Sequence, residues 1–243
     1  MTVRLDLEYD GSGFAGWARQ PGLRSVQEVL EAGLAQILQA PVELTVAGRT
    51  DRGVHASAQV ASYEGPLVRA EALNAVLPRD IAVLRSSEAR DGFDARRDAA
   101  SRSYRYRVLC RRERSALEEG RALWWPRRMN ESLLVACAEL LVGTHDFTAF
   151  TPTETYHVRF RRQVFAAQWR REGDMLLFEI EGDTFMRHMN RILVGTMLQV
   201  AAGRRELEDF AGLLEGAHRR DAGPTAPPHG LTLTGVSYAS DPA

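Results

Sequence analysis

The stretch that decides the fold of this 243-residue chain is a short strand, a glycine-bounded loop and the start of a second strand, Glu43-Leu44-Thr45-Val46-Ala47-Gly48-Arg49-Thr50-Asp51-Arg52-Gly53-Val54-His55-Ala56. Asp51 lies in this loop between two cations, Arg49 and Arg52. An aspartate in such a turn often only bonds its own backbone. Here the neighbouring guanidinium groups favour the ionised carboxylate, and they can also hold an anionic polymer. The stretch therefore suggests chemistry on a nucleic acid.

Outward from this loop, the first half of the chain predicts strands and helices in the order β-α-β-β-α-β, the split βαβ arrangement. Ser25 caps a helix, Glu28 completes a capping box, and Pro41 ends that helix. Its apolar side chains recur at helical spacing. The predicted strands are 3–8, 43–48, 59–63 and 81–86, and the second helix is 69–76.

The second half repeats this order more loosely. It predicts strands at 104–109 and 231–238, a hairpin of 163–170 and 175–181, and helices at 131–141, 187–201 and 207–214. We therefore expect an α+β fold in two halves, 1–100 with the Asp51 loop and 101–243. A mixed, largely antiparallel sheet and a central cleft between the halves would follow.

The net charge of −1 conceals a basic segment. Residues 90–128 carry 12 Arg and 6 acidic residues, a net charge of +6, and the chain has no lysine. Aromatic residues such as Tyr104 and Trp124 interrupt the arginines. Such segments are often only solvated surface. Arginine for phosphates with aromatic rings for bases is, however, typical of an RNA-binding groove.

Other classes of function find little support. No apolar run is long enough to span a membrane, and a strand starts directly after Met1, which leaves no room for a signal peptide. Two cysteines without metal-ligand spacing and six scattered histidines predict a cytoplasmic protein with no metal. Residues 11–16 fit the loose spelling of a dinucleotide-binding loop, but they follow an edge-like strand, so no cofactor is expected.

The helix predicted over 187–201 starts with three cationic or titratable residues, Arg187, His188 and Arg191. Arg187 and Arg191 are four residues apart and would share a face. They could lie at a solvated edge. An arginine buried near the helix start would instead need a partner, and Asp51 is the candidate carboxylate.

Tyr104 and Tyr106 alternate with Arg105 and Arg107. In a strand this spacing places both tyrosines on one face and both arginines on the other. Both tyrosines could belong to the core, or Tyr104 could stack on a nucleotide base.

Six ordered motifs resemble those of the TruA-type tRNA pseudouridine synthases. They are Tyr9-Asp10-Gly11-Ser12 with Gly16-Trp17 and Arg24-Ser25-Val26-Gln27; residues 47–56; Phe93-Asp94-Ala95-Arg96 with Arg102 and Tyr104-Arg105-Tyr106; His145-Asp146-Phe147-Thr148 with Phe150; Phe185 with His188-Met189 and Arg191; and Thr225-Ala226-Pro227 with Gly230-Leu231. The chain departs from the family pattern at Ser103, Thr151 and Ile192.

The resemblance implies a pseudouridine-synthase fold and isomerisation of uridine to pseudouridine at positions 38, 39 and 40 of tRNA. It implies Asp51 as the catalytic aspartate, Tyr104 as the active-site tyrosine, and Arg191 as the arginine that pairs with Asp51. It also implies a homodimer that binds tRNA and needs no metal or organic cofactor. Two alternatives stay open, a synthase with other RNA targets and a non-catalytic tRNA chaperone.

Cationic residues of these motifs are the predicted RNA contacts. They are Arg24, Arg49, Arg52, His55, Arg96, Arg102, Arg105 and His188.

Overall fold

The computed structural model describes residues 1–155 and 157–239, which form two compact units. Unit 1 contains Met1–Arg102 and the described residues from Thr232 onward, and unit 2 contains Ser103–Leu231. The chain passes from one unit to the other within two strands, β5 (Ala99–Leu109) and β10 (Leu231–Tyr238). The sequence predicts the last strand as part of the second half, 101–243, whereas from Thr232 on this strand belongs to unit 1.

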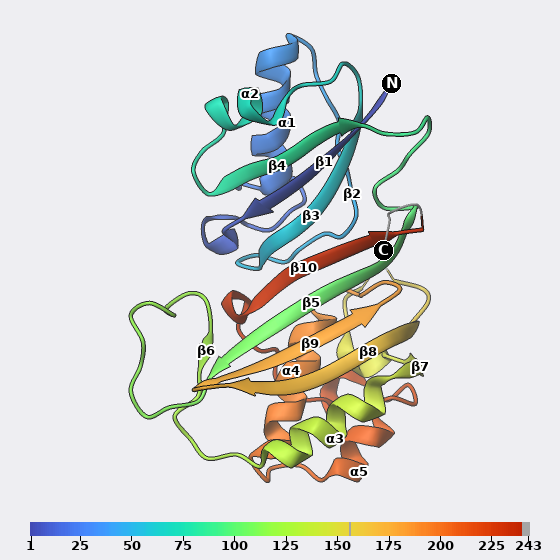
Figure 1. The fold of residues 1–243 in the computed structure, drawn as a ribbon. Coiled ribbons are helices and arrows are strands. Elements are labelled where there is room, and N and C mark those ends of the chain that lie inside the picture. The colour runs from blue at the N-terminus through green and yellow to red at the C-terminus, as the bar shows by residue number, and fades with distance from the viewer. Residues whose placement is uncertain (156, 240–243) are drawn as a thin grey trace. The chain divides into compact units, whose positions relative to one another are not determined.

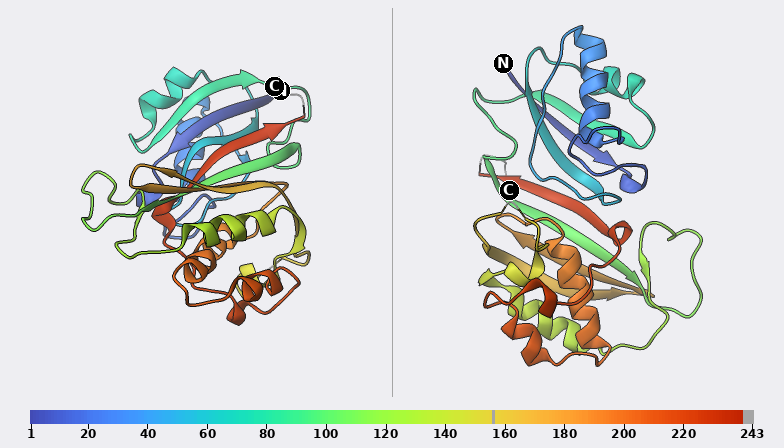
Figure 2. Two further views of the ribbon diagram at one scale, coloured as in Figure 1. Left: turned by 60° about the horizontal axis from the view of Figure 1, so that its bottom comes forward. Right: turned by 180° about the vertical axis from the view of Figure 1, so that it is seen from behind.

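Unit 1 is a sheet with two helices, and its predicted order β-α-β-β-α-β is confirmed. The strands lie in the order β4-β1-β3-β10, with β2 paired to β3. β1 is antiparallel to β3 and β4, and β10 is parallel to β3. Both helices lie on one face of these strands (Figures 1 and 2). The bounds are β1 (Thr2–Tyr9), α1 (Val26–Leu38), β2 (Thr45–Val46), β3 (His55–Glu64), α2 (Ala70–Val76) and β4 (Ile81–Glu88).

Local signals explain where α1 starts and stops. The Ser25 side chain accepts a hydrogen bond from Glu28 N at 3.3 Å, as the predicted cap requires. Leu30 and Leu34 are fully buried and carry the apolar face. The helix ends at Leu38, before Pro41, because Gln39 adopts the left-handed conformation with φ 54°.

The strand predicted at 43–48 is shorter than expected. Thr45 and Val46 are the strand residues of this stretch that pair with β3, and Ala47 N adds one hydrogen bond to Val60 O at 2.9 Å. The carbonyl oxygens of Ala47 and Gly48 accept hydrogen bonds from the Arg102 and Gln59 side chains. These side chains satisfy the carbonyls outside the strand ladder, and the chain is released into the Asp51 loop.

Unit 2 also consists of strands packed with helices. Its strands lie in the order β5-β9-β8-β7, and β6 is parallel to β5. In Figure 2, α3, α4 and α5 lie on one side of β8 and β9. The predicted β8–β9 hairpin is confirmed, but β6 and β7 were not predicted. The bounds are β6 (Leu123–Trp124), α3 (Glu131–Leu141), β7 (Gly143–Asp146), β8 (Arg161–Glu172), β9 (Met175–Gly182), α4 (Met189–Ala201) and α5 (Leu207–Gly212).

Helix α4 starts later than predicted. It begins at Met189, because His188 has a left-handed backbone with φ 62° and occupies the N-cap position. Arg187 therefore lies outside the helix and is exposed. The prediction that Arg187 and Arg191 share a helical face is wrong. Ile192, by contrast, is fully buried, as are most residues that follow it.

None of the helices in residues 1–155 and 157–239 combines the length and the apolar character needed to cross a membrane. Within the same residues, no three His, Cys, Asp or Glu side chains are grouped so that they could hold a metal ion.

Candidate active site

Asp51 lies in the loop between β2 and β3, and segments next to it fix its backbone. The residue forms an isolated antiparallel bridge with Gly16. On one side of Asp51, Trp17 N donates to Thr50 O at 3.0 Å. On the other side, Val54 N donates to Asp51 O at 3.1 Å, closing a tight turn. The main chain that carries the carboxylate is therefore held before and after Asp51.

The approach of the two loops depends on glycine. Gly16 has φ +111°, and a Cβ there would lie 2.9 Å from Thr50 O. A Cβ on Gly11 would overlap the carbonyl group of Val54. The glycines of residues 11–16 thus allow two backbones to come together. The spacing of these glycines resembles a loose dinucleotide-binding motif. In the structure, Gly11 and Gly16 instead let the loop after β1 lie against the Asp51 loop.

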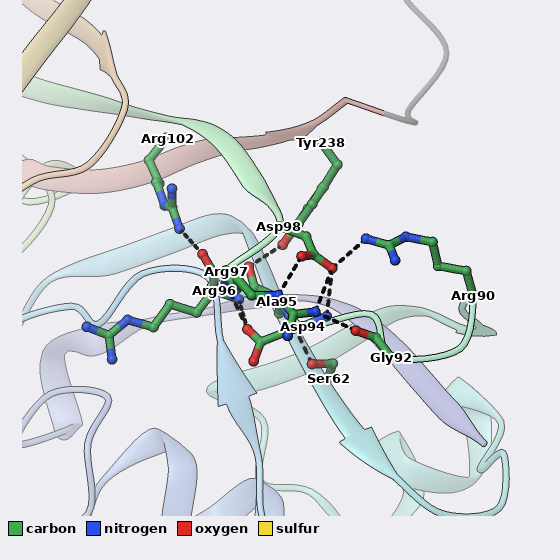
Figure 3. A network of polar contacts seen from close by, with 10 residues as sticks. All are labelled: Ser62, Arg90, Gly92, Asp94, Ala95, Arg96, Arg97, Asp98, Arg102 and Tyr238. Atoms are coloured by element: carbon green, nitrogen blue, oxygen red, sulfur yellow. Dashed lines mark hydrogen bonds and ion pairs between the residues drawn. The ribbon is translucent and has the colours of Figure 1, made fainter.

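Arg102 contacts the main chain close to this loop. Its Nε and Nη2 donate to Ala47 O at 3.0 and 2.9 Å, and Nη2 also donates to Arg96 O at 2.7 Å. Figure 3 shows the bond from Arg102 to Arg96 O, and beside it the bond that Tyr238 Oη donates to Ala95 O at 2.8 Å. The Arg102 side chain is 7% exposed. These contacts are structural, a use that the sequence did not predict.

Two further predicted RNA contacts of unit 1 hold neighbouring loops. The Arg24 guanidinium donates to both oxygens of Asp80 at 2.7 and 2.9 Å and lies over the Phe14 ring, 4.0 Å from its centroid. His55 Nδ1 accepts a hydrogen bond from Gly11 N at 3.1 Å. Both residues thus connect the segment after β1 to other parts of unit 1.

Three other predicted RNA contacts, Arg49, Arg52 and Arg96, have exposed side chains. Arg49 and Arg52 flank Asp51 within the same loop. An exposed guanidinium can reach phosphate oxygens without first breaking a buried contact. The exposure of these three side chains is compatible with the predicted contacts to RNA.

In unit 2, the two tyrosines of β5 occupy one face, as their spacing predicted. Tyr106 is fully buried and donates from Oη to Pro227 O at 2.8 Å. Burial raises the pKa of Tyr106, and the charge of Arg191 acts in the opposite direction. Tyr104 is 7% exposed, and its ring meets Phe185 edge-on with centroids 5.2 Å apart. Tyr106 is therefore core, and Tyr104 lies beside an aromatic residue of another motif.

Arg191 is anchored by a segment that follows it by more than thirty residues. Arg191 Nε donates to Ala226 O at 2.8 Å, and Ala226 N donates to Arg191 O at 3.0 Å. A Cβ on Gly195 would overlap Pro224 O, so this glycine lets the segment lie against α4. The closing sequence motif thereby supports the backbone and side chain of Arg191. Spacing along the chain gave no sign of this contact.

Arg105 belongs to an ion-pair cluster on the opposite face of β5 from the tyrosines. Its Nη2 lies 2.7 Å from Glu179 Oε1, and Arg170 Nε lies 3.0 Å from Glu179 Oε2. Hydrogen bonds from Arg170, then from Arg105 and Gln168, lower the pKa of Glu179 to about 2 against the opposing effect of burial. Arg105 thus has a protein partner in unit 2.

Asp51 belongs to unit 1, and Tyr104 and Arg191 belong to unit 2. The pairing of Asp51 with Arg191 and the central cleft stay predictions.

Comparison with known proteins decides the family. A family model described as tRNA pseudouridine synthase matches residues 137–239. The chain is 39% identical to the tRNA pseudouridine synthase A of Methylococcus capsulatus, over 99% of this chain and 91% of that protein. The chain belongs to the tRNA pseudouridine synthase A family. Identity is 40% with the Myxococcus xanthus synthase, over 99% and 93% of the two chains, and 41% with that of Frankia casuarinae, over 100% and 91%.

A solved structure titled as a crystal structure of a Cbf5-Nop10-Gar1 complex is also similar. Its TM-score is 0.41 at 11% identity, over 98% of this chain and 60% of that one. The assignment to the synthase family rests on the sequence relatives alone. Together they confirm the resemblance predicted from the six motifs.

Of the three departures from the family pattern, Thr151 and Ile192 are buried, with 2% and 0% exposure.

Proposed function

We propose that this protein isomerises uridine to pseudouridine in the anticodon stem-loop of tRNA, at positions 38, 39 and 40, with Asp51 as the catalytic carboxylate. The observation that carries the proposal is the near full-length similarity to tRNA pseudouridine synthases A. The fixed loop that carries Asp51 supports the choice of residue, because catalysis needs a carboxylate held in one geometry.

The reaction balances without any added atom or electron. The N1–C1′ glycosidic bond breaks and a C5–C1′ bond forms. C5 loses a proton, and N1 gains one. The target base must first leave the stack, which costs a few kcal/mol. Contacts to phosphates and to an aromatic ring can offset that cost.

Three residues have proposed roles in this chemistry. Asp51 either attacks C1′ as a nucleophile or removes the C2′ proton, and both routes start from an ionised carboxylate. Arg191 pairs with the Asp51 carboxylate. Tyr104 stacks on the extruded base and can take part in the removal of the C5 proton.

The direct test is release of tritium from tRNA that contains 5-³H-uridine, because only isomerisation frees the hydrogen on C5. Mapping of pseudouridine in total tRNA from a deletion strain identifies the targets. We expect tritium release and loss of the modification at positions 38–40. Missing modification elsewhere would favour a synthase with other targets. Tight tRNA binding without tritium release would favour the RNA chaperone.

We further propose a cytoplasmic homodimer in which Arg49, Arg52 and Arg96 contact phosphates. Cys110 and Cys137 are both free thiols, which suits a reducing compartment. Sedimentation of the protein with and without tRNA tests the dimer, and a monomer under both conditions would contradict it.

A further inference from the structure

A buried polar cluster adjoins the Asp51 loop and has no place in the proposed chemistry. Tyr9, the last residue of β1, places its hydroxyl 2.8 Å from Thr50 Oγ1. Gln59, from β3, donates from Nε2 to the Tyr9 hydroxyl at 3.2 Å and to Gly48 O at 2.8 Å. Tyr9, Thr50 and Gln59 are 4%, 7% and 0% exposed.

A buried polar cluster contributes less to the stability of a core than apolar side chains of the same size would. Burying an amide and two hydroxyl groups is unfavourable unless each finds a partner, and Phe and Leu would fill the space without that penalty. The contacts of this cluster are directed at two residues of the loop, the carbonyl of Gly48 and the side chain of Thr50. Thr50 is bonded directly to Asp51 in the chain. Burial also raises the pKa of Tyr9 to about 12, so its hydroxyl stays protonated and able to donate.

We propose that Tyr9 is a positioning residue, whose hydroxyl acts through Thr50 to fix the direction in which the Asp51 side chain leaves the loop. The proposal rests on the proposed function, because it assigns the geometry that Asp51 needs for catalysis. The hydrogen bond from Trp17 N to Thr50 O fixes the main chain of Thr50. The Tyr9 hydroxyl, bonded to Thr50 Oγ1, fixes the side chain of Thr50 as well. Misplacement of a catalytic group by about 1 Å can lower a rate by about a hundredfold.

Unit 1 contains a closely matched control, Tyr63. Tyr63 is 3% exposed, against 4% for Tyr9. Its hydroxyl accepts from Val68 N at 3.2 Å and donates to Pro66 O at 2.9 Å. Burial raises the pKa of Tyr63 as well. Its contacts lie beyond the end of β3, not in the Asp51 loop.

The first experiment compares Tyr9→Phe with Tyr63→Phe. Each change removes one buried hydroxyl, so the two variants should lose similar stability in urea unfolding. We expect kcat for pseudouridine formation to fall about tenfold or more in Tyr9→Phe. Its KM for tRNA should stay within about twofold of the wild type, because phosphate contacts dominate binding. Tyr63→Phe should keep a kcat close to that of the wild type.

The second experiment tests whether Tyr9 acts through Thr50. Thr50→Val should lower kcat as Tyr9→Phe does, and the double variant should be no slower than the slower single one. Thr50→Ser, which keeps the hydroxyl, should restore most of the rate. Additive losses in the double variant would overturn the proposed route through Thr50.

A third measurement does not depend on activity. Backbone amides of residues 48–54 should exchange with deuterium faster in Tyr9→Phe than in Tyr63→Phe. Equal exchange in the two variants, or an equal kcat, would overturn the positioning role. If the wild type forms no pseudouridine, the proposed function fails, while the exchange comparison still decides whether Tyr9 holds the loop.

Discussion

At the scale of single residues, Asp51 presents its carboxylate from a main chain that neighbouring residues hold in place by hydrogen bonds. Asp51→Asn removes the charge and keeps the shape, so the bonds of Thr50 and Val54 should persist. We expect turnover to fall by at least about a hundredfold. Affinity for tRNA should stay within about tenfold of the wild type, because phosphate contacts dominate binding. Tritium release and filter binding measure the two effects. A variant that forms pseudouridine at a near-normal rate would remove Asp51 from the mechanism.

Glu179 gives a prediction for the pH dependence of stability. Its pKa is lowered to about 2 in the folded protein, from an ordinary value of 4.5. The ionised form therefore stabilises the fold above about pH 5, and this contribution disappears as the pH falls toward 2. Glu179→Gln should lower the free energy of unfolding by about 1 kcal/mol at pH 7. Urea unfolding at pH 7 and pH 3 checks this, and an equal loss at both values would contradict it.

The residues that sequence reasoning placed well are those with local signals. The Ser25 cap, the alternation of tyrosines with arginines over 104–107 and the turn around Asp51 all depend on neighbours in the chain. Arg102 and Arg105 were predicted only as RNA contacts. Their partners in the fold, Ala47 and Glu179, lie 55 and 74 residues away. No pattern along the chain shows that a distant carbonyl or carboxylate will meet a given guanidinium.

At the scale of elements, α4 is fixed by the segment that packs against it. Gly195→Ala in a free helix would be stabilising by up to about 1 kcal/mol. Here the new Cβ would overlap Pro224 O, so we expect a loss of about 1–3 kcal/mol. Activity should fall as well, because Ala226 can no longer anchor Arg191 as firmly.

The matched control is Gly212→Ala in α5, where no atom would lie within 4 Å of the new Cβ. That variant should be as stable as the wild type or slightly more so. Urea unfolding compares the two. Equal stability of both variants would show that the Pro224 segment moves aside at little cost.

Element boundaries were the least predictable part of the fold. The helix predicted over 187–201 includes Arg187 and His188, but the left-handed backbone of His188 makes the helix begin at Met189. Strands β6 and β7 are two and four residues long, too short to show an alternating pattern. The longer elements α3 and β10 match their predicted bounds.

At the scale of the whole molecule, binding of tRNA should depend strongly on salt. Arg49 and Arg52 are exposed, and we propose that each contacts a phosphate. Replacing either with Gln should weaken binding for all tRNAs and reduce the slope of log K against log salt by about 1. Arg220→Gln is a suitable control, because this exposed arginine lies outside the predicted contacts. An unchanged slope in Arg49→Gln and Arg52→Gln would exclude both residues as phosphate contacts.

The return of β10 to unit 1 has a consequence for synthesis on the ribosome. β10 pairs with β3 through Thr232 and Leu233, and Tyr238 packs in a cluster with Val60 and Phe93. This strand is translated only after all of unit 2. Until it emerges, the nascent amino-terminal unit leaves part of β3 as an open edge, a hazard for association with other chains. Completion of the unit that carries Asp51 therefore has to wait until β10 has been translated.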